Sequence, residues 1–187
     1  MVLGVSASDD ARATDIAPEA SYVVVAPFTT RPQKHWSHAH WRALICHLAD
    51  AGHQVACLGG PGDREEAVTL LGGLPVMDWV GAYPLGVSAG LVKQAAAVIG
   101  VDTGLTHMGI AAGIPTVALF GSTCPYRETG RDNVRVIYHE LKCAPCKRSP
   151  TCAGRFDCMV GITADEVMSA FNELVVKRLG ARSGQPR

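Results

Sequence analysis

The segment Val98–Gly113 (VIGVDTGLTHMGIAAG) combines residue types that can bind a phosphate. An apolar run ends at Asp102, and a helix is expected to begin directly after it, where free backbone N–H groups bind anions. Thr103 adds a hydroxyl donor, Gly104 lets a ligand approach the backbone closely, and His107 lies one turn into the helix. Asp102 or Thr103 would also cap a helix that binds nothing. Because capping needs neither the glycine nor the histidine, the pattern favours an anion site.

The segment PFTTRPQKHW, residues 27–36, follows an earlier apolar run and carries a second set of candidates. Thr29 and Thr30 can donate hydrogen bonds to phosphate oxygens, and Lys34 supplies a positive charge. Taken alone, Lys34 would be an ordinary surface lysine. His35 and Trp36 could also contact a ligand, although Trp36 is better explained as a residue that packs before the next helix.

Two further loops offer groups for the rest of a nucleotide. The turn Gly59–Asp63 (GGPGD) lacks the Gly-Lys-Ser/Thr ending of a P-loop. Asp63 could accept hydrogen bonds from a ribose, or it could only cap the helix that follows. Trp79 and Tyr83 could form one wall of a base pocket, or either ring could simply pack in the protein.

Four of the seven cysteines lie in one late tract, at Cys143, Cys146, Cys152 and Cys158. The Cys-x-x-Cys that opens the tract is typical of a loop that binds a structural zinc ion or an iron–sulfur cluster. The later spacing lacks the second Cys-x-x-Cys of a zinc ribbon. A surface loop with reduced or paired thiols is therefore the alternative. No other metal site is predicted.

Strands that alternate with helices must position these candidate residues. Short apolar runs predict strands at residues 22–26, 54–58, 75–78, 98–101, 116–120 and 134–138. Helical patterns are found at residues 39–51, 64–71, 84–96 and 102–113, and after a capping box at Thr163 and Glu166. This order predicts an α/β fold, a Rossmann-like parallel sheet with helices on both faces. Such sheets bind ligands outside the carboxyl ends of their strands, where the candidate loops fall.

The chain of 187 residues is predicted to form one domain. Residues 1–20 show no periodicity and are expected to be a linker or lead-in. Residues 21–180 are expected to be the ligand-binding domain, and residues 181–187 a disordered tail.

The composition argues against several classes of protein. The 17 basic and 17 acidic residues give no net charge, which is unlike a nucleic-acid binder or a membrane-surface binder. No apolar run approaches the ~20 residues of a membrane span, and the first residues lack the pattern of a secretory signal. The sequence therefore predicts a cytoplasmic location.

These segments together resemble glycosyltransferase family 9, the ADP-heptose:lipopolysaccharide heptosyltransferases, which have a GT-B fold. TTRPQKHW at residues 29–36 is similar to the donor-phosphate loop of the family, and VDTGLTHMGIAAGIPTVALFGST at residues 101–123 is similar to its signature strand–helix–strand. The cysteine tract, residues 143–159, is similar to a segment of many members. The resemblance covers about residues 22–179.

The resemblance implies that one group of residues faces the sugar and the diphosphate. Thr29, Thr30 and Lys34 would hold the diphosphate and the sugar side of the donor, and Asp102 would face the heptose. Lys34 would take part in catalysis by stabilising the leaving diphosphate.

A second group would bind the nucleotide. Thr103, Gly104 and His107 would contact the diphosphate from the helix start. Asp63 would lie near the ribose, and Tyr83 would lie at the adenine.

The reaction implied is an inverting displacement that requires no metal or other cofactor. A hydroxyl of the lipopolysaccharide inner core attacks the anomeric carbon, and ADP leaves. The family places its catalytic base in an N-terminal acceptor domain, so this chain would be only the C-terminal donor half, a fragment that is inactive alone. It would meet the lipopolysaccharide acceptor through the missing domain, and the full-length enzyme could lie peripherally at the inner membrane.

Two other functions are consistent with the same residues. The chain could be a stand-alone nucleotide-binding module that performs no chemistry. It could also be an epimerase of GT-B fold that acts on nucleotide sugars.

Overall fold

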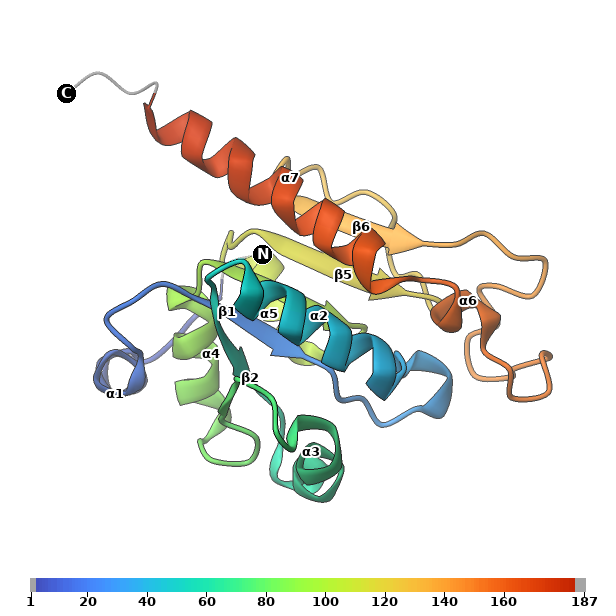
Figure 1. Ribbon diagram of the computed structural model, residues 1–187, viewed down its shortest axis with the longest axis horizontal. Helices are drawn as coiled ribbons and strands as arrows, with labels where there is room; N and C mark the ends of the chain where they lie inside the picture. The colour runs from blue at the N-terminus through green and yellow to red at the C-terminus, as the bar shows by residue number, and fades with distance from the viewer. Residues whose placement is uncertain (1–2, 184–187) are drawn as a thin grey trace.

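The protein forms a six-stranded parallel sheet covered by helices (Figure 1). The structure is a computed structural model, and it describes residues 3–183. The spatial order is β3-β2-β1-β4-β5-β6, and every neighbouring pair is parallel. The strands are β1 (Tyr22–Ala26), β2 (Gln54–Cys57), β3 (Met77–Asp78), β4 (Ala97–Val101), β5 (Thr116–Phe120) and β6 (Val134–Tyr138). The chain runs outward from β1 to β3 and then returns to place β4 beside β1. Ligands bind at such a reversal of strand order.

Helices cover both faces of this sheet. They are α1 (Ala7–Ile16), α2 (His38–Asp50), α3 (Arg64–Leu71), α4 (Leu85–Gln94), α5 (Gly104–Ala111), α6 (Asp157–Val160) and α7 (Ala164–Ser183), with two 3-10 turns, η1 (Pro32–Lys34) and η2 (Pro61–Asp63). Among the described residues, no helix is both long and apolar enough to cross a membrane.

Alternate side chains of β1 enter two separate cores. Val23 and Val25 pack in the core formed with α2, α3 and α7, whereas Tyr22 and Val24 pack in the core formed with α1, α4 and α5. All five residues of β1 are buried. A strand covered on both faces needs this continuous apolar run. The parallel sheet with helices on both faces confirms the predicted α/β fold.

The predicted elements agree with the structure except at some ends. The strand expected at 75–78 is only Met77–Asp78, and the helix expected at 84–96 ends at Gln94. At the predicted capping box, the Glu166 backbone N–H donates to Thr163 Oγ1 over 3.2 Å. The Glu166 carboxylate does not complete the box; it contacts His139 Nε2 at 3.0 Å instead.

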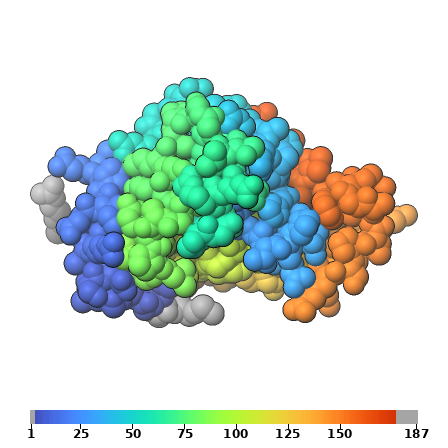
Figure 2. Space-filling model, turned by 90° about the horizontal axis from the view of Figure 1, so that it is seen from below, coloured from blue at the N-terminus to red at the C-terminus, as the bar shows by residue number. Residues whose placement is uncertain are grey.

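Residues 1–20 were expected to be a linker or lead-in without periodicity, and their middle part forms the helix α1. Ser6 caps this helix by accepting a hydrogen bond from the Asp9 backbone N–H over 3.1 Å. The helix lies against α4 on the surface, dark blue beside green in Figure 2. Ala13 is its only buried residue, and Gly90 of α4 lies opposite. The helix α1 packs through small residues, so it has no apolar periodicity by which the sequence could reveal it.

The expected disordered tail, residues 181–187, also begins differently. The helix α7 continues through Ser183, so residues 181–183 are helical. Residues 184–187 lie outside the described part of the chain. The buried stripe of α7 includes Val167, Phe171 and Leu174, which pack in the core shared with α2.

We expect Gly90→Ala to lower the free energy of unfolding by about 1–2 kcal/mol. An added Cβ would meet the Ala13 Cβ at 2.7 Å and the Asp9 carbonyl oxygen at 3.4 Å, so α1 would have to move. Chemical denaturation followed by circular dichroism measures the change.

The sign of this change is informative, because alanine is favoured over glycine inside a free helix by up to about 1 kcal/mol. Stabilisation by Gly90→Ala would therefore contradict the packing of α1 on α4. Gly62→Ala is the matched control, since a Cβ there meets nothing within 4 Å.

Candidate functional site

Two adjoining cavities lie where the loops after β1, β2 and β4 meet. The first, about 330 Å³, is lined by Phe28, Thr29, Thr30, Lys34, Asp63, Asp102, Thr103 and Gly104. The second, about 270 Å³, shares Phe28, Asp63, Thr103 and Gly104 with it and adds Tyr83 and the glycine turn after β2. Every predicted binding residue except His107 therefore lines one of the two cavities. His107 instead borders a third cavity, of about 420 Å³.

The start of α5 leaves its polar groups free for a ligand. Thr103 has extended backbone and precedes the first helical residue, Gly104, but its side chain makes no capping hydrogen bond. The Asp102 carboxylate does not cap the helix either, because its hydrogen bonds go to other side chains. The simple capping explanation is therefore wrong, and a hydroxyl and free N–H groups face the cavity region.

Gly100 lets α5 lie close to the sheet. A Cβ at this position would overlap the Thr106 hydroxyl and would meet the Ala26 Cβ at 3.0 Å. Thr106 is fully buried and donates its hydroxyl to the Val101 carbonyl oxygen over 2.7 Å. The absence of a side chain at Gly100 thus helps to bring the first turn of α5 to the ends of β1 and β4.

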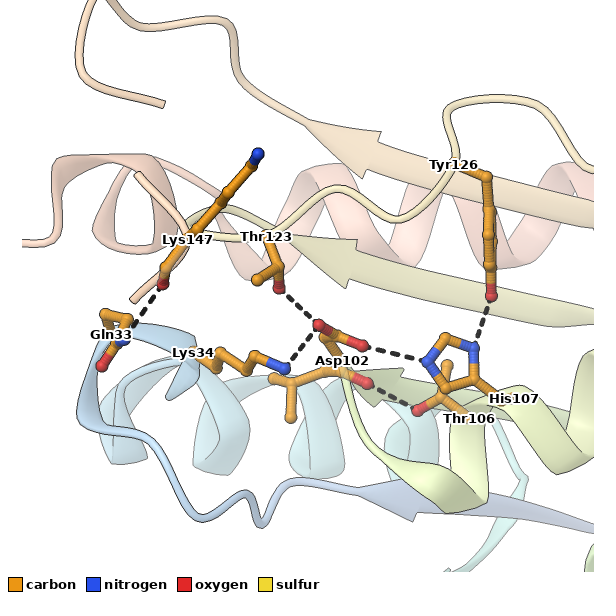
Figure 3. Close-up of polar contacts among 9 residues, drawn as sticks. Gln33, Lys34, Asp102, Thr106, His107, Thr123, Tyr126 and Lys147 are labelled. Carbon is orange, nitrogen blue, oxygen red and sulfur yellow. Dashed lines mark hydrogen bonds and ion pairs between the residues drawn. The ribbon is translucent and has the colours of Figure 1, made fainter. Parts of the chain in front are cut away.

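The Asp102 carboxylate is the centre of the polar network in Figure 3. Its Oδ2 lies 2.6 Å from Lys34 Nζ and accepts a hydrogen bond from the Thr123 hydroxyl. Its Oδ1 lies 2.9 Å from His107 Nε2. The Asp102 and Lys34 side chains are only 12% and 18% exposed.

These contacts determine the charge of Asp102. Burial opposes ionisation, but the hydrogen bonds from His107, Lys34 and Thr123 and the charge of Lys34 outweigh it and hold the pKa of this carboxyl well below its usual range. Asp102 is therefore a carboxylate at neutral pH. Its negative charge keeps the cation of Lys34 in the cavity.

Thr123 and Tyr126 belong to the network but were not predicted. Both follow β5, and the Tyr126 hydroxyl lies 2.6 Å from His107 Nδ1. The loop after β5 lies at the same edge of the sheet as the other loops, and its hydroxyl residues were the only available signal. The pairing itself could not be predicted, because Thr123 is 21 residues from its partner Asp102.

The loop that carries Lys34 is held in place by its neighbours. The Gln33 side chain donates to the Lys147 carbonyl oxygen over 3.2 Å (Figure 3), and the Trp36 indole N–H donates to the Ile162 carbonyl oxygen over 2.8 Å. Trp36 is 1% exposed, so its predicted packing role is confirmed. His35 Nε2 lies 2.7 Å from the Thr29 carbonyl oxygen and also supports the loop.

Asp63, which lines both cavities, and Tyr83 are the predicted nucleoside contacts. Asp63 does not cap α3; its Oδ2 accepts a hydrogen bond from the Gly60 backbone N–H over 2.7 Å and closes the glycine turn. Tyr83 lines the second cavity. Trp79 packs edge-on against Tyr22 at 5.4 Å between ring centroids and is 8% exposed, so it is a core residue.

The four late cysteines lie near one another. Burial raises the pKa of the Cys158 thiol, and nearby Cys146, Cys143 and Cys152 raise it further. All seven cysteines are free thiols in the structure. Within residues 3–183, no three His, Cys, Asp or Glu side chains are placed to hold a metal ion.

We expect Asp102→Asn to lower the free energy of unfolding by about 1–3 kcal/mol at neutral pH, because Lys34 loses its partner. The folded-state pKa of Asp102 is below the unfolded value of about 3.9. Its contribution is therefore present above about pH 4 and is lost as the pH falls through the folded-state pKa. Urea denaturation across this pH range should show the two proteins converging in acid.

The exposed Asp132→Asn is the control and should change stability little at any pH. An Asp102→Asn difference that is equally large in acid would show that the carboxylate charge is not what stabilises the site.

Several known heptosyltransferases are similar to this chain. Lipopolysaccharide heptosyltransferase 1 of Pseudomonas aeruginosa is 35% identical over 147 residues, which cover 77% of this chain and 41% of that protein. Lipopolysaccharide heptosyltransferase 2 of Escherichia coli is 27% identical over 158 residues, which cover 78% of this chain and 44% of that protein. The chain therefore spans less than half the length of these relatives.

Solved structures agree with this similarity. The structure of E. coli heptosyltransferase WaaC with ADP is 30% identical, with a TM-score of 0.63 over 85% of this chain and 46% of that one. The structure of E. coli ADP-heptose lps heptosyltransferase II has a TM-score of 0.78 at 23% identity, over 95% of this chain and 54% of that one. The described sheet and helices thus match about half of a GT-B heptosyltransferase.

The family profile matches most of the chain. Residues 1–156 match the glycosyltransferase family 9 (heptosyltransferase) profile. This match includes every predicted binding residue and the first three cysteines of the late tract. The chain belongs to glycosyltransferase family 9, the heptosyltransferases.

Proposed function

We propose that this chain is the C-terminal, donor-binding half of an inverting enzyme that transfers heptose from ADP-heptose to the lipopolysaccharide inner core. The observation that carries the proposal is the pair of adjoining cavities at the strand ends. One contains a cation and the free start of a helix, and the other contains an aromatic ring and a carboxylate. This pairing of polar and apolar subsites suits a nucleoside diphosphate.

The diphosphate would occupy the first cavity. The backbone N–H groups from Gly104 onward, the Thr103 hydroxyl and the hydroxyls of Thr29 and Thr30 are donors, and Lys34 supplies the charge. The ammonium of Lys34 has three N–H donors, so it can keep its contact with Asp102 while it binds a phosphate oxygen.

The nucleoside would occupy the second cavity. Tyr83 offers a ring for the base, and Asp63 offers a carboxylate for the ribose hydroxyls. One Asp63 oxygen already accepts from Gly60, which orients the other. A structure of the relative WaaC with ADP supports an adenine nucleotide as the ligand.

The heptose would extend from the diphosphate toward Asp102. A structure of WaaC with ADP-2-deoxy-2-fluoro heptose, 28% identical to this chain, supports this sugar as the donor group. Because an ionised carboxylate only accepts hydrogen bonds, Asp102 is suited to sugar hydroxyls and repels the diphosphate. Thus Lys34 and Asp102 would together divide the cavity into a phosphate side and a sugar side.

Catalysis by this half would consist of leaving-group stabilisation. When the acceptor hydroxyl attacks the anomeric carbon, negative charge builds on the departing diphosphate, next to Lys34 and the start of α5. These groups can neutralise that charge without a metal ion. Deprotonation of the acceptor belongs to the other half of the enzyme, so we propose that the chain alone does not transfer heptose. The two-domain enzyme would work in the cytoplasm at the inner membrane.

The alternatives make different predictions. A stand-alone binding module would bind a nucleotide but would gain no activity when joined to an acceptor domain. An epimerase would change or hydrolyse a nucleotide sugar without an acceptor, a reaction that membership of a transferase family does not favour. Incubation of the chain with ADP-heptose alone, and with ADP-heptose together with an acceptor domain and the lipopolysaccharide acceptor, separates the three functions.

We expect calorimetric titration to show that the chain binds ADP in preference to UDP and GDP. Lys34→Ala and Thr103→Ala should each weaken ADP binding by about 10- to 100-fold, because each removes a hydrogen bond to a charged group. Lys142→Ala, at an exposed lysine outside both cavities, is the matched control and should bind like the unmodified chain.

Equal affinity for the three nucleotides would contradict an adenine pocket. If no nucleotide binds, the same titration on a protein that contains both halves tests the remaining explanation, a pocket completed by the acceptor domain. Failure there as well would reject the donor site.

We also expect ADP affinity to be unchanged, within about twofold, after treatment with a metal chelator, because Lys34 and the helix start supply the positive charge. Loss of ADP binding on chelation would contradict the metal-independent mechanism.

Metal analysis of the purified chain tests the cysteine tract separately. A stoichiometric metal that stabilises folding without affecting ADP affinity would assign a structural metal site to this tract.

A further inference from the structure

We infer that Tyr126 is a positioning residue that donates a hydrogen bond to Nδ1 of a neutral, Nε2-protonated His107 and, through this ring, orients Asp102 in the proposed donor site. No residue of the loop after β5 was among the expected binding residues. The inference concerns the protonation and the orientation of two side chains. Its consequence for sugar binding rests on the proposed function.

The direction of the hydrogen bonds follows from their partners. Asp102 is ionised and can only accept, so His107 Nε2, 2.9 Å away, must carry a proton. The Tyr126 hydroxyl lies 2.6 Å from the other ring nitrogen, Nδ1. Burial first, and the negative charge of Asp102 second, raise the pKa of Tyr126 to about 12, so this hydroxyl keeps its proton. In a neutral ring the single proton is then on Nε2, so Nδ1 is an acceptor and the Tyr126 hydroxyl donates to it.

The position of the Tyr126 hydroxyl is fixed by ring packing. The ring lies edge-on to Phe120 at 5.3 Å and to His107 at 5.7 Å between centroids. Phe120, at the end of β5, is fully buried. The loop is therefore attached to a rigid strand end, and the ring cannot turn its hydroxyl away without losing these contacts.

The same loop reaches both oxygens of Asp102, as Figure 3 shows. Thr123 donates directly to Oδ2, and Tyr126 acts on Oδ1 through His107. Lys34 shares Oδ2 with Thr123. When a diphosphate attracts Lys34, Thr123 and His107 would still hold the carboxylate in its position. Without Tyr126, Nδ1 would lose its hydrogen-bond donor, so the His107 ring, and with it one support of Asp102, would be held less firmly.

The first experiment is nitrogen-15 NMR of the histidine rings in the ligand-free 187-residue chain at about pH 8, above the usual titration range of histidine. We expect His107 to show a protonated Nε2 and an unprotonated, hydrogen-bonded Nδ1. In Tyr126→Phe the Nδ1 resonance should lose the hydrogen-bond shift, while the proton stays on Nε2 next to Asp102. The variant keeps the ring that packs on Phe120, so circular dichroism and the melting temperature should remain close to those of the unmodified chain.

Tyr138→Phe is the matched control. It removes a hydroxyl from neighbouring β6 that lies outside this hydrogen-bond chain, and the His107 resonances should not change. A proton on Nδ1 in the unmodified chain would overturn the inference. So would a Tyr126→Phe spectrum in which the His107 resonances are unchanged. The measurement on the unmodified chain decides the tautomer even if the variant folds poorly.

The second experiment compares ADP with ADP-heptose by calorimetry. We expect Tyr126→Phe to weaken ADP-heptose binding by about 3- to 10-fold, the range of one neutral hydrogen bond, and to change ADP binding by less than about twofold. Equal weakening of both ligands, or of neither, would overturn the role in sugar binding. If the unmodified chain binds neither ligand, the proposed function fails, whereas the NMR result on the tautomer still stands.

Discussion

The largely covered carboxylate of Asp102 is the constraint on which the arrangement of the site depends. An ionised group that is only 12% exposed needs partners for its oxygens, and these come from the loop after β1, the first turn of α5 and the loop after β5. Each partner therefore has a required position. Three segments that are far apart in the chain converge because one charge must be satisfied.

The sheet makes this convergence possible. The strand order places β4 between β1 and β5, so the loops after Ala26, Val101 and Phe120 leave from adjacent strand ends. Apolar cores on both faces hold these strands rigidly. The polar groups therefore lie on loops that are short extensions of a rigid framework, a placement that favours binding with little loss of conformational entropy. The two cavities lie at these strand ends.

Glycines set the closest approaches in the molecule. Gly100 permits the contact between α5 and the sheet, and Gly90 permits the contact between α1 and α4. In both places the missing side chain allows two backbones to approach, and no large apolar residue marks the contact.

The sequence by itself determined the fold class and most of the residues that line the two cavities, because strands buried on both faces require apolar runs and parallel strands bring their following loops to one edge. Lys34, Thr103 and Gly104 could be found in this way. Only the tertiary structure decided which groups pair: that Asp63 closes the turn at Gly60, and that Tyr126 contacts His107. It also decided that residues 7–16 form a helix. Such contacts join residues through space, often through a glycine or a single hydroxyl, and neither leaves a periodic pattern in the sequence.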